Sequence, residues 1–207
     1  MNGVMIVLLL ALNFGISWLN AWSVGRSWAD TKAVGGWSRV VIWCAAIMSA
    51  CGFTWCYLIM LALGAGALGL LEPQYVQVAL EIGYLVIIGP ILGSGLGIWI
   101  DSLTTAWRRR SVGSVAVAGW NTFAQVHNTY QAAKAIPEIL QHLGEVFKSK
   151  SGGKDAAKAK ALILVVILVI LAICGGVLTT TMIIRSTARK YANRTLNDVN
   201  DKEKSVA

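Results

Sequence analysis

The sequence has few charged residues and few of the side chains on which catalysis and metal binding usually depend. Charged residues make up 14% of the 207 positions, against about 25% in an ordinary soluble domain. The four cysteines form no CxxC pair, and the two histidines have no acidic or cysteine partner at metal-ligand spacing. These shortages exclude a soluble enzyme and a disulfide-stapled miniprotein, and they predict no metal site.

Sequence motifs for catalysis or cofactor binding are missing as well. The chain contains no phosphate-binding loop of the GxxxxGK[ST] type. It offers no Ser–His–Asp or paired-carboxylate arrangement, and it has neither zinc-finger spacing nor an RNP-like motif. We therefore expect a protein without enzymatic activity, without a cofactor and without a nucleic-acid partner.

Long stretches without charge are what the sequence does contain. These stretches cover residues 1–25, 40–71, 82–100 and 161–184. A run of about 18 apolar residues is long enough for a membrane-spanning helix, and a backbone in lipid must satisfy its own hydrogen bonds. The sequence thus predicts an all-α, polytopic integral membrane protein. The expected spans are roughly 3–24, 40–64, 76–100 and 161–184.

This prediction divides the chain into three regions. Residues 1–100 hold three spans, 101–160 form a basic amphipathic helical segment with a hydrophilic linker, and 161–207 hold the fourth span and a polar tail. The net charge of +8 lies outside the spans, as expected for orientation and for attraction to anionic headgroups. The side chains expected at the headgroups are Arg108, Arg109, Arg110, Trp99 and Trp107.

The distribution of Lys and Arg predicts orientation. With four spans, placing 26–39 and 101–160 in the cytoplasm puts twelve of the 18 basic residues on that side. A five-span arrangement that adds 111–133 scores the same. We favour four spans, because Asn121, Gln125 and other polar side chains would otherwise be desolvated. The predicted location is a bacterial-type cytoplasmic membrane.

A regular apolar stripe runs through the segment between the third and fourth spans. Its members recur mostly at spacings of three and four, which is typical of one face of a helix. Pro137 is expected to end one helix and to begin another. The stripe can face the membrane interface, other helices or copies, or a soluble partner, and its heptad-like spacing favours helix contact. The predicted interaction face is Val112, Ala116, Phe123, Val126, Tyr130, Leu140, Leu143 and Phe147.

The sharpest local pattern is a row of glycines, Gly89, Gly93 and Gly97, inside the third span. Glycines four residues apart form a groove that another helix can approach closely. Packing within one subunit, packing between subunits and a pore-lining role are all compatible with this groove. Glu81, in the same span, is interpreted as an interfacial carboxylate or as a proton or cation site.

Together these patterns predict a non-enzymatic structural or assembly subunit of an oligomeric membrane complex. The glycine-rich helix and the amphipathic cytoplasmic helices would provide its contacts. Its partners would be the anionic bilayer and further subunits, either copies of the chain or components of a larger complex. The alternative is a small channel or pore-forming protein with the third span near the path.

Overall fold

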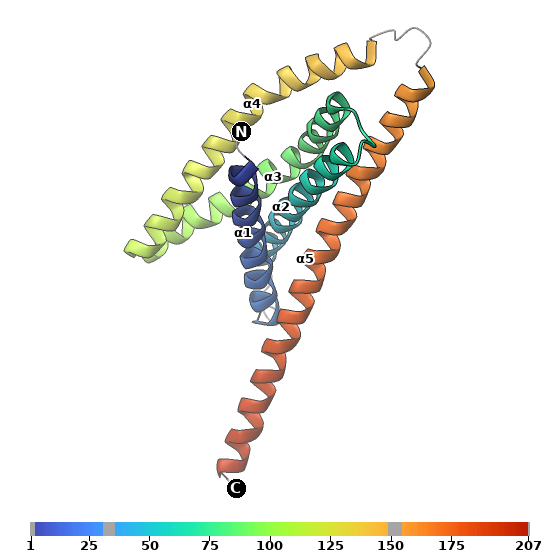
Figure 1. Cartoon of the computed structure of the whole chain (residues 1–207). Helices are drawn as coiled ribbons and strands as arrows, with labels where there is room; N and C mark the ends of the chain where they lie inside the picture. Colours follow the sequence, from blue (N-terminus) through green and yellow to red (C-terminus); the bar gives the residue numbers. More distant parts are fainter. Residues whose placement is uncertain (1–2, 31–35, 149–154, 207) are drawn as a thin grey trace.

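The computed structural model describes the backbone of residues 3–30, 36–148 and 155–206. This part of the chain contains five long α-helices and no strand (Figure 1). The helices are α1 (Gly3–Asp30), α2 (Trp37–Ala67), α3 (Pro73–Arg109), α4 (Val112–Lys148) and α5 (Asp155–Val206).

Four of these helices are long and apolar enough to cross a membrane. The segments concerned are Gly3–Trp28, Trp37–Ala67, Pro73–Arg109 and Ala157–Asn193. The all-α class is therefore confirmed, and four helices long and apolar enough to span a membrane lie where the sequence predicts spans. Each helix runs past its expected span, because a polar terminal turn continues the backbone hydrogen bonds of the apolar turns before it.

The first three helices pack as antiparallel neighbours. Ser49 on α2 donates to the backbone oxygen of Ser17 on α1 at 2.6 Å. On the other side of α2, the glycines of α3 allow close contact: Gly83 lies against Leu58, and Gly97 lies against Cys44. Buried polar side chains at the α1–α2 contact thus have a partner within the bundle.

The direction of α5 follows from what it contacts at each end. Near its start, Val165 and Leu168 join a buried cluster with Leu71 and Tyr75, beside the α2–α3 connection. Near its far end, Tyr191 stacks edge-on against Trp22 of α1 at 6.2 Å. The later part of α5 therefore lies at the end of the bundle that holds the α1–α2 connection (Figure 1).

The segment after α3 differs from the prediction. We expected two helices separated at Pro137, but α4 is one continuous helix that contains this proline. Pro137 lies on the exposed side of α4, so the Ala133 carbonyl, which loses its usual donor, is not enclosed. The expected linker is also shorter, because α5 already begins at Asp155; residues 149–154 lie outside the described part.

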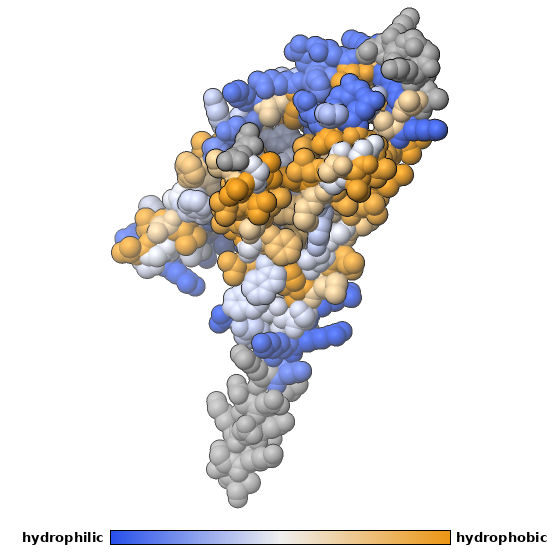
Figure 2. All heavy atoms as spheres, viewed as in Figure 1, coloured by the Kyte–Doolittle hydropathy of each residue, from blue (hydrophilic) through white to orange (hydrophobic). Residues whose placement is uncertain are grey.

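The surface shows where lipid is the expected solvent. Figure 2 shows hydrophobic side chains gathered across the middle of the molecule and hydrophilic side chains towards its upper and lower ends. On α1, Val4, Leu8 and Leu12 are 67%, 64% and 61% exposed. Such a large apolar surface is unusual for a soluble monomer and ordinary for a bilayer-embedded one.

Candidate functional site

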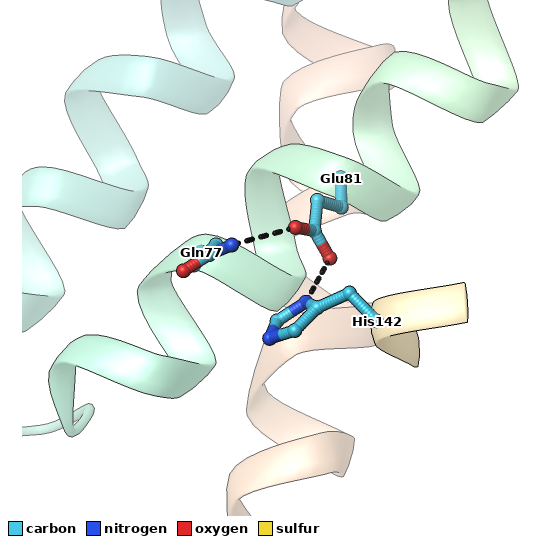
Figure 3. Close-up of polar contacts among 3 residues, drawn as sticks. All are labelled: Gln77, Glu81 and His142. Carbon is cyan, nitrogen blue, oxygen red and sulfur yellow. Dashed lines mark hydrogen bonds and ion pairs between the residues drawn. The ribbon is translucent and has the colours of Figure 1, made fainter. Parts of the chain in front are cut away.

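The most concentrated polar contact between helices joins α3 and α4. The Nδ1 atom of His142 lies 2.7 Å from one carboxyl oxygen of Glu81. Gln77, one turn before Glu81, donates to the other oxygen at 2.8 Å (Figure 3). The Glu81 side chain is only 13% exposed, and that of His142 is 33% exposed. Both carboxyl oxygens of a largely enclosed acid are therefore hydrogen-bonded.

The pairing of these residues is not visible in local sequence spacing. The sequence predicts no metal-ligand role for His142, and the structure makes it the partner of a carboxylate 61 positions earlier in the chain. The turn at Arg110 folds the chain back, so that residues roughly equally far on either side of it meet. Glu81 and His142 form one such pair, and Trp99 and Thr122 form another. Knowledge of the turn would have revealed both pairs.

Two further contacts join α3 and α4 nearer the turn. Gln125 donates to the backbone oxygen of Leu92 at 3.2 Å and also touches Gly95. The Trp99 indole N–H donates to the Thr122 hydroxyl at 2.8 Å. The indole N–H of Trp99 is thus occupied within the chain, and headgroup contact by Trp99 stays a prediction. Gln125 has a hydrogen-bond partner, so its desolvation is partly compensated.

The turn between α3 and α4 is compact and basic. Arg110 adopts a left-handed conformation with φ of 48°, and the Ser111 hydroxyl accepts from the Ser114 backbone N–H at 3.2 Å. This is the usual N-cap hydrogen bond of a serine before a helix. The Arg110 guanidinium lies 5.7 Å from the ring of Trp107, which is 77% exposed. Headgroup contact by Trp107 and the three arginines 108–110 stays a prediction.

Aromatic side chains gather at the same end of the bundle as the α1–α2 connection. The Trp37 indole donates to Asp101 at 3.1 Å, and Trp28 stacks edge-on against Trp43 at 5.4 Å. The Arg26 guanidinium lies 5.6 Å from the Tyr191 ring. These contacts bring α1, α2, α3 and α5 together at one level. Indole and phenol rings favour the membrane interface, so this level is a natural boundary of the hydrocarbon.

The predicted glycine row is not a uniform groove within the chain. A Cβ atom added at Gly97 would lie 2.7 Å from the sulfur of Cys44, but at Gly89 or Gly93 it would meet nothing within 4 Å. Within the described part of the chain, no other helix lies on those two glycines. Their packing role stays a prediction, and it concerns contact with another molecule.

The glycines that do permit close backbone approach escaped sequence analysis. At Gly176 on α5, an added Cβ would lie 2.7 Å from the Ala50 oxygen and 2.7 Å from the Thr54 nitrogen, both backbone atoms of α2. At Gly25 on α1, it would lie 2.7 Å from the Ile184 oxygen of α5. Gly176 and Gly25 are far apart in the chain and belong to no glycine repeat, so spacing gave no signal.

The predicted interaction face of α4 points away from the rest of the chain. Its exposed members are Val112, Ala116, Phe123, Val126, Tyr130, Leu140 and Phe147. Leu143 is the exception: it is 7% exposed and belongs to the core cluster with α3 and α5. The structure therefore leaves this face without a partner among the described residues.

The polar contacts of the bundle differ from a metal centre. Among the described residues, no group of three His, Cys, Asp or Glu side chains could hold a metal ion. What the α3–α4 contact offers chemically is one acid and one imidazole in direct hydrogen bonding, which can share a proton and fix the two helices together. Comparison with protein-family models, with curated proteins and with solved structures found no match.

Proposed function

We propose that the protein is a non-enzymatic structural or assembly subunit of an oligomeric membrane complex, and that α3 provides the contact with the next subunit. The observation that carries this proposal is an open, apolar, glycine-containing face on the second half of α3. The same face is covered by α5 along the first half of the helix. The next subunit is a further copy of the chain or another component of the complex.

The covered and open parts of this face form one continuous surface. Near the start of α3, Tyr75 and Val78 are 8% and 0% exposed in the cluster that α5 completes. From about one turn past Ile82, the surface is open: Val86, Leu96 and Ile100 are 44%, 44% and 40% exposed. A membrane helix whose neighbour covers only part of its length leaves the rest of that face as a site where another helix can pack.

The backbone of α3 at this face has small residues and a carbonyl without its usual donor, and both favour contact with another helix. Gly89 and Gly93 have no Cβ atom, so another backbone can approach closely. Pro90 has no N–H, so the carbonyl of Val86 loses its usual donor within the helix. In hydrocarbon an unsatisfied carbonyl is costly. A neighbouring helix could donate a hydrogen bond to this carbonyl and make close van der Waals contact with the two glycines.

A pair of glycine substitutions tests this proposal. Gly93→Leu fills the open face, and we expect it to convert the oligomer to monomer in mild detergent while leaving the helix content unchanged. Gly15→Leu is the matched control, because Gly15 is also an exposed helical glycine with nothing within 4 Å of an added Cβ. The measurement is mass by light scattering and chemical crosslinking in native membranes. A monomeric wild type, or equal oligomers in both variants, would contradict the proposal.

The end of the bundle with the α1–α2 connection is the side we infer to be cytoplasmic, in a bacterial-type cytoplasmic membrane. Arg26, Arg39 and the three arginines 108–110 lie in or beside the connections α1–α2 and α3–α4. Basic residues near span ends are retained on the cytoplasmic side. The same residues would contact anionic headgroups, worth about 1 kcal/mol for each basic side chain near the surface.

A small channel or pore-forming protein is the second candidate. It is favoured by a groove between the helices whose otherwise mostly apolar lining includes four amide side chains of α1 and α4. Because Gly89 and Gly93 face outward, any path that they line would lie between copies. Purified protein in liposomes distinguishes the candidates: ion flux from the protein alone supports a pore, and stoichiometric partners without flux support an assembly subunit.

A further inference from the structure

We propose that α4 crosses the membrane beside α3, with its apolar stripe against lipid acyl chains and its polar side along a water-filled groove shared with α1. The apolar stripe is the exposed set defined above, from Val112 to Leu140. The chain would then cross the bilayer five times. This inference does not depend on whether the protein assembles into oligomers.

The directions of the helices require a return path. The α1–α2 connection and the later part of α5 lie at one end of the bundle, as the contacts of Trp22 and Arg26 with Tyr191 show. The start of α5 lies at the opposite end, against Leu71 and Tyr75. Since α3 runs from that opposite end towards the first, the chain must come back before α5 begins. Among the described helices, α4 is the one that connects the end of α3 with the start of α5, so it runs back between the two ends.

The path of α4 follows α3 through the depth of its apolar span. The contacts between the two helices run from Trp99–Thr122 near one end to Glu81–His142 near the other. Along α3 these contacts are separated by about 27 Å of helix rise, close to the roughly 30 Å thickness of the hydrocarbon core. If α3 lies in the membrane over this length, α4 lies there beside it.

The side chains of α4 are distributed as such a position requires. The face towards α3 holds Ala118 and Ala132, 5% and 2% exposed, together with Thr122 and Gln125, whose polar groups are hydrogen-bonded. The apolar stripe faces outward: Val126, for example, is 60% exposed. A helix with its polar groups inside and its apolar groups outside suits lipid and not water.

Two further polar side chains of α4, Asn128 and Gln131, lie towards α1. They line a groove of about 320 Å³ opposite Asn13 and Asn20 of α1, among mostly apolar neighbours. Among the described residues, the amides of Asn20, Asn128 and Gln131 make no side-chain hydrogen bond to any other residue. Unpaired amides at membrane depth are costly unless water reaches them, so we infer that the groove is hydrated.

Two charged residues continue the same polar side. Lys134 and Glu138 follow Gln131 at spacings of three and four, and both are exposed. Charged residues inside a membrane face a water-filled cavity or the bundle interior. Neither residue lines the groove, so we infer that its water extends along the same side of α4 to these charges, while the other side of the helix contacts lipid.

Lipid is the occupant we assign to the apolar stripe because of where the stripe lies and what flanks it. It begins at the basic α3–α4 turn, at the end of the bundle where Trp28, Trp43 and the other aromatic side chains gather. Five crossings also bring the basic start of the tail to that same side. Twelve of the 18 basic residues share one side, the same number as with four crossings, but the twelve now include Arg185, Arg189 and Lys190, which directly follow an apolar span.

Single cysteines on a chain whose four native cysteines are replaced by alanine test the crossings. Ser38→Cys, Ser111→Cys and Ala192→Cys mark exposed positions at one end, and Gln74→Cys marks the other. In intact cells, a membrane-impermeant maleimide should label either all of the first three positions or only Gln74→Cys. Labelling of Ala192→Cys together with Gln74→Cys would overturn the proposal, because it shows that α4 does not cross.

Quenching by brominated lipid tests the surface itself. Val126→Cys and Gln131→Cys, each labelled with a small fluorophore, are placed in vesicles of phosphatidylcholine and phosphatidylglycerol with brominated acyl chains. We expect strong quenching at position 126 and little at position 131. Absence of quenching at both positions would show that another protein chain or water covers the stripe, and equal quenching at both would show that lipid fills the groove; either result overturns the assignment.

Discussion

Gly176→Ala is expected to destabilise the bundle more than any other single-methyl addition on α5. An added Cβ at this position would lie 2.7 Å from two backbone atoms of α2, the Ala50 oxygen and the Thr54 nitrogen. Backbone atoms in a helix cannot rotate away as a side chain can, so α2 and α5 must separate. Overpacking of a well-packed contact usually costs about 1–3 kcal/mol, and we expect a loss near the upper end of that range.

The measurement is thermal unfolding in detergent, followed by circular dichroism, with Gly15→Ala as the control. Gly15 has nothing within 4 Å of an added Cβ, so alanine there should leave stability unchanged or raise it, by up to about 1 kcal/mol from helix propensity. The two variants introduce the same methyl group into two apolar helices, and only Gly176→Ala should lower the midpoint. Equal shifts would show that α2 and α5 are not in backbone contact at Gly176.

This contrast between glycines explains part of what sequence analysis could and could not predict. The apolar helices were predictable because charge is excluded from hydrocarbon over a fixed length, and the structure has a helix long and apolar enough to span a membrane at all four places. The packing glycines were not, because a missing Cβ matters only where another helix passes. Gly89 and Gly93 have regular spacing and open surroundings, whereas Gly176 follows another glycine and lies against two backbone atoms.

The position of α4 beside α3 could not be predicted from the sequence, for a different reason. Asn121, Gln125 and Asn128 reduce the hydropathy of this segment, so a count of apolar residues favours water. The structure shows that Gln125 has a backbone partner on α3. Such compensation depends on a contact between residues 33 positions apart, and no local pattern contains it. The effect of Pro137 could not be predicted from the sequence either, because it depends on which side of α4 the proline occupies.

His142→Leu is expected to weaken the contact between α3 and α4 substantially. The substitution leaves one carboxyl oxygen of Glu81, a side chain only 13% exposed, without its partner. An enclosed acceptor that loses its hydrogen bond costs about 1–3 kcal/mol, and more if it stays charged. Gln141→Leu is the matched control on the preceding residue, because Gln141 is exposed and bonds only within its own helix, to Glu145 at 3.1 Å. That change should stay within about 0.5 kcal/mol.

The double variant Glu81→Leu/His142→Leu separates the hydrogen bond from simple packing. If His142→Leu destabilises because it leaves a carboxylate unpaired, removing the carboxylate as well should recover most of the lost stability. If His142 acts only by filling space, leucine replaces much of its volume and the two losses should add. Denaturant titration in detergent of the wild type, both single variants and the double variant gives the coupling free energy. A coupling near zero would mean that the 2.7 Å contact contributes nothing to holding α4 on α3. The return path of the chain would then depend on the contacts nearer the turn, at Trp99 and Gln125.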